Sequence, residues 1–376
     1  MHELELFHLP GPPADAGFAH GRALAHFFQS TFFDAYIASL CAINRVEHDD
    51  MFKQADRWLA RLPEHFQIEI DAMASGARTR TPRVAAFLYA DIARPTDAVA
   101  TRDPAHQNPA ASPEDPANHT LLGGPMCSAV ALELNGRPWV ARNCDWLTAT
   151  LVRGTAAVVH EVPGRIPVMA LGIKGDIDID TGVNAERLWL HLHTLYSPEE
   201  PRGDRTQISW LFWAREALET CATLDELDRF IASTDRDRGV IVVAADAKSN
   251  ERALFECSRS GHLRIDAGDL PLIATNHPQH KHPTPERAAK SRPGATLARY
   301  CAVRDLIAET PPEHGPDDLI DLLADPGVEM RTPTHLRTIY SAVADPARGD
   351  IWFAAGSADG SPAASTGGWL KAPWLW

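Results

Sequence analysis

The stretch 123–146, GGPMCSAVALELNGRPWVARNCDW, gathers residue types that covalent catalysis uses. It contains two thiols, Cys127 and Cys144, together with Arg142 and Asp145. A thiolate is a strong nucleophile, and a nearby arginine favours the thiolate over the thiol. A carboxylate can hold an arginine or an amine in place. These residue types therefore permit nucleophilic attack by a cysteine on a carbonyl group.

A β-hairpin would bring these residues together. Two apolar runs, CSAVALEL and PWVARNC, flank Asn135-Gly136, which is a strong signal for a tight turn between antiparallel strands. With this turn as the centre, Cys127 lies opposite Cys144, and Arg142 is a diagonal neighbour of Cys127 on the same face, roughly 7–8 Å away between Cα atoms. Asp145 follows directly and can turn towards the same end. The alternative is a structural, half-buried cysteine beside an Arg–Asp pair.

The rest of the chain predicts the elements that would carry this hairpin. Residues 17–92 repeat apolar side chains at three- and four-residue spacing, which predicts helices. Residues 93–126 are rich in proline and alanine, which is typical of a linker. From Cys127 onward, groups of strands alternate with pairs of helices, which favours antiparallel sheets sandwiched by helices. We expect a helical segment at 1–92, a linker at 93–126 and a core at 127–376.

Composition excludes several classes of protein. The chain has 376 residues, of which 44% are hydrophobic, and this is enough for a large core. Its net charge of −14, without a basic run, argues against a nucleic-acid partner. No apolar run reaches membrane-spanning length, the N-terminus lacks signal-peptide features, and the six cysteines form no CxxC pair. We therefore expect no membrane partner, a cytoplasmic location and free thiols.

The motifs resemble a known superfamily. CSAVALELNGRPWVARNCDW resembles the nucleophile hairpin of the N-terminal-nucleophile (Ntn) hydrolases, above all the acyl-coenzyme A:6-aminopenicillanic acid acyltransferase-like branch, to which choloylglycine hydrolase and acid ceramidase types are related. Further segments resemble that branch in the same order: GFAHGRALA, IDAMASGART, DTGVNAERLWL, LIATNHP, PGATLARYCAVRDLI and RTIYSAVADPARGDIWFA. The resemblance implies an α+β fold, a four-layer αββα sandwich of antiparallel sheets with an N-terminal helical segment.

The resemblance also implies a reaction. In that superfamily a precursor cuts itself just before the cysteine, here between Met126 and Cys127, and the new α-amino group becomes the base for the thiol. Asn184 matches an oxyanion-hole asparagine, Asn276 a second asparagine, and Arg299 a characteristic arginine. The substrate implied is a small-molecule linear amide, with no cofactor and no metal, and a homo-oligomer stays open. The implied catalytic set is Cys127, Arg142, Asp145, Asn184, Asn276 and Arg299.

Two other functions compete with this interpretation. Met126 stands where a small residue is usual before the nucleophile, which keeps open a catalytically inactive member of the fold that binds a ligand. A His-ligated metal hydrolase is the second alternative. It would use His191 and His193 or the cluster His277, His280 and His282, although no HExxH motif is present.

Three further patterns have simple structural explanations. Asp176, Asp178 and Asp180 alternate like calcium ligands but lack the glycine and the terminal glutamate of a calcium loop. We expect them on a solvated strand face or at an acidic edge beside the substrate. Taken without the resemblance, Asn184 and Asn276 are ordinary turn or cap residues.

Overall fold

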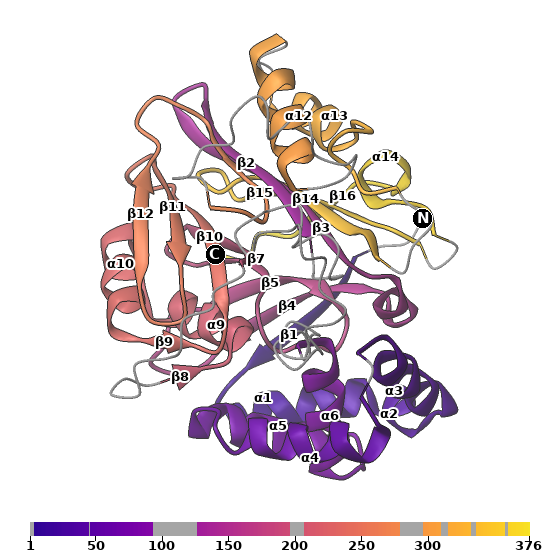
Figure 1. The fold of residues 1–376 in the computed structure, drawn as a ribbon. Helices are drawn as coiled ribbons and strands as arrows, with labels where there is room; N and C mark the ends of the chain where they lie inside the picture. The colour runs from indigo at the N-terminus through magenta and orange to yellow at the C-terminus, as the bar shows by residue number, and fades with distance from the viewer. Residues whose placement is uncertain are drawn as a thin grey trace, which may run out of the picture.

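The computed structural model describes residues 4–44, 46–92, 126–195, 207–278, 296–309, 315–331, 336–357 and 360–376. In this part of the chain, two large sheets form the centre of the molecule (Figure 1). The first has the strand order β1 (Glu5–Pro10), β4 (Thr155–Glu161), β5 (Val168–Ile173), β6 (Thr181–Asn184), β7 (Leu188–Leu195), β10 (Gly239–Asp246), β11 (Glu251–Cys257) and β12 (His262–Asp266). The second has the order β13 (Leu272–Ala274), β2 (Met126–Leu134), β3 (Arg137–Leu147), β14 (Leu336–Asp345), β15 (Asp350–Ala355) and β16 (Leu370–Ala372).

The two sheets pack face to face, and helices cover their outer faces. Strands β2 and β3 contact β7 and β10 across the interface. Helices α9 (Trp210–Thr220) and α10 (Leu224–Ser233) lie on the eight-stranded sheet. Helices α12 (Thr296–Glu309), α13 (Pro316–Leu323) and α14 (Ala363–Thr366) lie on the six-stranded sheet (Figure 1). The described layers therefore follow the order α, β, β, α, and the predicted α+β class is confirmed.

Local sequence signals explain several of these elements. Asn135 and Gly136 both have positive φ, 53° and 71°, as a two-residue type I′ turn requires. This turn sets the register of β2 and β3, in which Leu134 pairs with Arg137 and Cys127 with Cys144, as predicted. Helix α10 begins at a capping residue, because Oγ1 of Thr223 accepts the backbone N–H of Glu226. A short parallel pair, β8 (Gln207–Ile208) and β9 (Asp235–Arg236), lies beside the large sheets.

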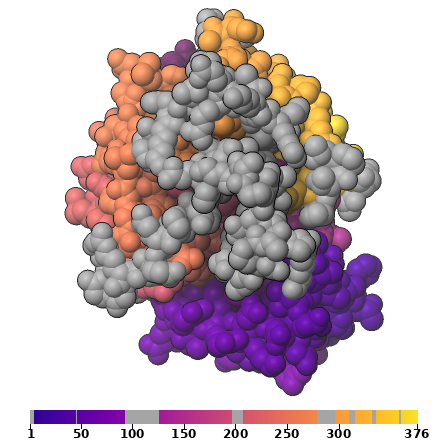
Figure 2. Space-filling model, viewed as in Figure 1, coloured from indigo at the N-terminus to yellow at the C-terminus, as the bar shows by residue number. Residues whose placement is uncertain are grey.

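The first 92 residues form a helical block against the eight-stranded sheet, coloured indigo to purple in Figures 1 and 2. Its helices are α1 (Pro13–Ala23), α2 (Ala25–Gln29), α3 (Thr31–Asn44), α4 (His48–Leu59), α5 (Glu64–Gly76) and α6 (Thr81–Ile92). Helices α1 and α5 cross closely at glycine, because a Cβ on Gly17 would lie 2.2 Å from the backbone oxygen of Glu69. The block also contributes strand β1, which pairs in parallel with β4 and was not predicted.

Buried ion pairs fasten the helical block to the core. Arg215 on α9 forms ion pairs with Glu69 on α5 and with Glu219, each at 2.8 Å, and all three side chains are almost fully buried. Of the predicted linker, residues 93–125 lie outside the described residues.

Candidate active site

The β2–β3 hairpin brings Cys127 and Arg142 into contact. Cys127 pairs with Cys144 and Arg142 pairs with Ala129, so these side chains share the face of the sheet that looks towards β7 and β10. Nη2 of Arg142 donates a hydrogen bond to Sγ of Cys127 over 3.1 Å, and both side chains are buried. A guanidinium at this distance stabilises negative charge that develops on the sulfur.

The opposite sheet holds Arg142 through the loop between β5 and β6. Nη1 of Arg142 donates to the backbone oxygen of Asp180 over 2.9 Å and to Oγ1 of Thr181 over 2.7 Å. It also lies 3.1 Å from Oδ2 of Asp180, to which Oη of Tyr340 on β14 donates over 2.8 Å. The carboxylate that positions Arg142 is therefore Asp180. Asp145 reaches the same end of the hairpin, but it lies on the opposite face of β3, because side chains alternate along a strand.

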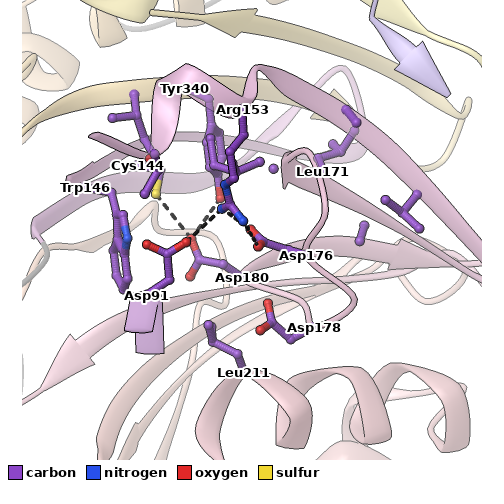
Figure 3. A pocket seen from close by; sticks show the side chains of 17 residues that line it. Asp91, Cys144, Trp146, Arg153, Leu171, Asp176, Asp178, Asp180, Leu211 and Tyr340 are labelled. Carbon is purple, nitrogen blue, oxygen red and sulfur yellow. Dashed lines mark hydrogen bonds and ion pairs between the residues drawn. The ribbon is translucent and has the colours of Figure 1, made fainter. Parts of the chain in front are cut away.

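Cys144 meets a different electrostatic environment from Cys127. Its Sγ donates to Oδ2 of Asp180 over 3.3 Å, as the dashed line in Figure 3 shows. Burial raises the pKa of Cys144 well above its usual value, and the hydrogen bond with Cys127 and the charge of Asp180 act in the same direction. Cys144 therefore stays a neutral thiol at physiological pH.

On the other face of the hairpin, Asp145 and Arg299 form a buried pair. Nη1 of Arg299, on α12, lies 3.6 Å from Oδ2 of Asp145, and Oγ1 of Thr338 donates to Oδ1 of Asp145 over 2.6 Å. Burial raises the pKa of Asp145 to about 6, while Arg299 and Thr338 act to lower it. Arg299 also donates to the backbone oxygen of Cys127 and, over 2.7 Å, to Oγ of Ser128. Arg299 thus links Asp145 to the backbone of Cys127.

Asn276, which follows β13, contacts the backbone N–H of Cys127. Its Oδ1 accepts the backbone N–H of Cys127 over 2.8 Å and a hydrogen bond from Nη2 of Arg299 over 3.0 Å. Its Nδ2 donates to the backbone oxygen of Thr194 on β7 over 3.1 Å. The nitrogen, the carbonyl oxygen and the sulfur of Cys127 each have a different polar partner.

Asn184 is not brought to this cluster. It ends β6, three residues beyond Thr181, which is about 10 Å along a strand. Its Nδ2 donates to the backbone oxygens of Leu218 and Cys221, and its Oδ1 accepts the backbone N–H of Leu188. These bonds all go to backbone groups, which is the behaviour of a structural turn residue. The structure therefore brings together Cys127, Arg142, Asp145, Asn276 and Arg299, and it adds Asp180, Thr181 and Tyr340.

Two of the histidines proposed as metal ligands lie between the sheets. His191 and His193 are fully buried, and burial lowers the pKa of both well below the usual value. Nδ1 of His191 accepts a hydrogen bond from Nε1 of Trp189 over 2.9 Å. His277 is also buried, with Nδ1 about 3.0 Å from Oγ1 of Thr275, whereas residues 280 and 282 lie outside the described residues.

Metal-ligating groups converge elsewhere. Among the described residues, His65, Glu216 and Glu219 are the only group of three whose ligand atoms lie close enough to share an ion. Nη1 of Arg165 lies 2.9 Å from Glu216 and 3.0 Å from Glu219, and Arg215 also pairs with Glu219, so two arginines already compensate these two carboxylates.

Of the three alternating aspartates, Asp178 is buried, contrary to the expectation of a solvated strand face, whereas Asp176 and Asp180 are half-buried. All three lie in the loop between β5 and β6 and line a pocket that Cys144 and Tyr340 also line (Figure 3). Asp180 contacts both Cys144 and Arg142, and Arg142 contacts the sulfur of Cys127, so the pocket lies close to Cys127. The expectation of an acidic edge describes this loop better.

Known structures and families allow a comparison. No curated protein matches the chain by sequence. A mutant of conjugated bile acid hydrolase from Clostridium perfringens is similar, with a TM-score of 0.46 and 11% identity over 66% of this chain and 97% of that one. The Caenorhabditis elegans ortholog of N-acylethanolamine-hydrolyzing acid amidase has a TM-score of 0.45 and 18% identity, covering 66% of this chain and 100% of that one. Penicillin V acylase from Agrobacterium tumefaciens has a TM-score of 0.43 and 18% identity, covering 61% and 82%.

The family comparison covers most of the chain. The family described as acyl-coenzyme A:6-aminopenicillanic acid acyl-transferase matches residues 132–359, a range that contains Arg142, Asp145, Asn276 and Arg299 and begins five residues after Cys127. None of the helices in the described part of the chain has the length and hydropathy that a bilayer-spanning segment needs. The predicted resemblance is thereby confirmed, and the chain belongs to the acyl-coenzyme A:6-aminopenicillanic acid acyl-transferase family.

Proposed function

We propose that the chain is a cysteine amidase or acyltransferase of the Ntn type, in which Cys127 forms an acyl-enzyme with a small-molecule linear amide. The observation that carries this proposal is that three polar side chains contact three different atoms of Cys127. Arg142 contacts its sulfur, Asn276 its nitrogen and Arg299 its carbonyl oxygen. Buried polar partners that fix all three groups of one cysteine are more than a structural thiol needs.

Maturation would begin at the bond between Met126 and Cys127. Sγ of Cys127, as the thiolate, adds to the carbonyl carbon of Met126, the C–N bond breaks, and the nitrogen of Cys127 takes up a proton. Water then hydrolyses the thioester, leaving a carboxylate on Met126 and a free thiol and α-amine on Cys127. Oδ1 of Asn276 already accepts a hydrogen bond from this nitrogen, so it would hold the new amine as well.

Turnover would use that amine as the base. An α-amine has a pKa near 8, so a useful fraction is neutral at pH 7 and accepts the proton of the thiol. The sulfur attacks the amide carbonyl, the amine returns the proton to the leaving nitrogen, and the acyl group remains on Cys127 as a thioester. Water or a second amine then takes the acyl group. Arg142 would stabilise the charge on the sulfur in both half-reactions.

Intact mass and peptide mapping test this proposal. We expect purified protein to give two fragments divided between Met126 and Cys127, and to carry an acyl adduct on the peptide that begins with Cys127 after mixing with N-acyl p-nitroanilides. Cys127→Ala should give one intact chain without an adduct. An uncut wild-type chain that forms no adduct and releases no amine from any amide would instead support a catalytically inactive, ligand-binding member of the fold.

A further inference from the structure

The pocket beside the nucleophile is unusually acidic. Four carboxylates line it, Asp91 at the end of α6 and Asp176, Asp178 and Asp180 in the loop between β5 and β6, and Figure 3 shows them around one space. The guanidinium of Arg153, from the 3-10 helix Thr148–Arg153, lies among them. The remaining walls are largely apolar and include Val158, Ala170, Leu171, Leu211 and Ile339.

Arg153 in the pocket wall and Arg142 beside the pocket supply two positive charges for four carboxyl groups. Arg153 forms ion pairs with Asp91 at 2.8 Å and with Asp176 at 2.9 Å, and Arg142 pairs with Asp180 at 3.1 Å. Asp178 is only 7% exposed and makes no hydrogen bond or ion pair with any residue that the structure describes. An ionised carboxylate that is buried without a partner is costly, and a cation bound in this pocket would offset that cost.

The chemistry of the walls indicates which kind of cation fits. In the described part of the chain, no three of these carboxylates bring their oxygens close enough together to share one metal ion. An organic cation is larger, and it can contact the carboxylates with its charged group and the apolar walls with its carbon atoms. Trp146 also lines the pocket, and an indole ring attracts organic cations. An ammonium group on a short alkyl chain meets all three requirements.

We propose that this pocket binds a protonated amino group carried by the amide substrate. The proposal rests on the proposed function, because the pocket reaches the nucleophile through Arg142. One nitrogen of that guanidinium contacts Sγ of Cys127 and the other contacts Asp180, so a single guanidinium separates the thiol from the acidic wall. The ammonium group of the substrate therefore lies only a few bonds from the scissile carbonyl.

Burial makes two of the pocket carboxyl groups hold protons more tightly, so a bound ammonium group must displace those protons. Burial raises the pKa of Asp176 to about 7 and the pKa of Asp178 well above its usual value, with neighbouring carboxylates contributing. Protons on these groups partly relieve the repulsion among them, and a bound ammonium group would replace that relief with direct ion pairs.

Matched amides that differ only in charge test the proposal. β-Alanyl p-nitroanilide and butanoyl p-nitroanilide have the same shape, but the first ends in an ammonium group and the second in a methyl group. We expect kcat/KM of the wild type to favour the β-alanyl substrate by about tenfold or more. Asp178→Asn should abolish that preference while leaving the butanoyl substrate within about threefold, a change of less than about 1 kcal/mol. Asp266→Asn, on an exposed strand outside the pocket, should leave both values unchanged.

A second pair places the charge on the amine side of the scissile bond. N-(2-aminoethyl)butanamide and N-propylbutanamide differ in the same way, and a preference for the charged member that depends on Asp178 supports the proposal equally. If neither pair shows a preference that depends on Asp178, or if Asp178→Asn lowers activity on both members of a pair alike, the cation site is wrong. Turnover of the neutral amides in that case leaves the proposed function standing.

If the wild type turns over no amide at all, a binding measurement separates the two proposals. Ligand-observed NMR on Cys127→Ala should show that β-alaninamide binds at least about tenfold more tightly than butanamide, and that Asp178→Asn on this background removes the difference. Such binding without turnover of any amide by the wild type would retain the cation site and reject the amidase. Equal binding of the two amides would reject the cation site.

Discussion

Cys127 and Cys144 are the same residue type at paired positions of one hairpin, yet their sulfur atoms contact side chains of opposite charge. The sulfur of Cys127 receives a hydrogen bond from the Arg142 guanidinium. The sulfur of Cys144 donates a hydrogen bond to the Asp180 carboxylate, and burial together with that charge keeps it protonated. The backbone of Cys127 is also held by Asn276 and Arg299.

The register of the strands places both thiols at the site. The sign of the charge beside each sulfur then decides which thiol can act as a thiolate. Both side chains are about equally buried, at 3% and 2% exposure, so burial does not distinguish them. A cation favours the anionic sulfur that attacks a carbonyl, and a carboxylate opposes it. Cys144 is therefore better suited to line the pocket than to react.

The largest expected effect comes from exchanging each thiol for a methyl group. Cys127→Ala should lower turnover of an amide by more than about 10³-fold, because the covalent step disappears. Cys144→Ala should retain turnover within about tenfold. Cys144→Ala loses a buried sulfur but should still be cleaved before Cys127, so thermal unfolding close to that of the wild type serves as its control. Activity that survives in Cys127→Ala and vanishes in Cys144→Ala would assign the nucleophile to the other thiol.

The next effect concerns Arg142 and Arg299, whose guanidinium groups lie on opposite faces of the hairpin. Arg299→Gln leaves Asp145 fully buried without its ion-pair partner, so it should lower the free energy of unfolding by about 3–5 kcal/mol. Arg142→Gln should cost less stability, because its partner Asp180 is 20% exposed and keeps its hydrogen bond from Tyr340. Urea unfolding measures both losses.

A double variant checks why Arg299→Gln should lower the free energy of unfolding. In Arg299→Gln/Asp145→Asn the buried charge is removed together with its partner, so the variant should regain about 0.5–3 kcal/mol relative to the sum of the single changes. Additive losses would mean that Arg299 stabilises the hairpin only through the backbone of Cys127 and Ser128.

The Cys127 side of the hairpin could be predicted because its signals are local. The Asn135-Gly136 turn sets the register, and the register places Arg142 beside the sulfur. The Cys144 side could not be predicted in this way. Asp180 and Tyr340 are 160 residues apart in the sequence and meet only because the two sheets pack face to face.

Two misassigned residues show the limits of short motifs. Asn184 matched a family position, but nearby backbone groups take up its amide. Asp178 was expected on a solvated strand face or at an acidic edge beside the substrate, and its burial contradicts the first of these. It is buried because α6 and the 3-10 helix before β4 supply Asp91 and Arg153 to the same pocket. Strand β1 was missed because its partner β4 lies about 150 residues away, as in the pair Glu5 and Ala156.

The last expected effect is a dependence of stability on pH that belongs to Asp145 alone. Burial raises its pKa to about 6 in the folded chain, whereas an aspartate in the unfolded chain has a pKa of about 3.9. Between these two values the folded state binds more protons, so the contribution of this carboxyl to stability is highest below about pH 4 and falls as the pH rises to about 6. The total fall is about 3 kcal/mol. Asp145→Asn carries no charge at any pH and lacks this dependence. Its stability relative to the wild type should therefore improve by up to that amount between about pH 4 and pH 7, as measured by urea unfolding at steps of one pH unit. Parallel curves for the two proteins would mean that Arg299 and Thr338 keep the carboxyl ionised throughout, and that the face of the hairpin that contacts α12 has a fixed charge rather than a titrating one.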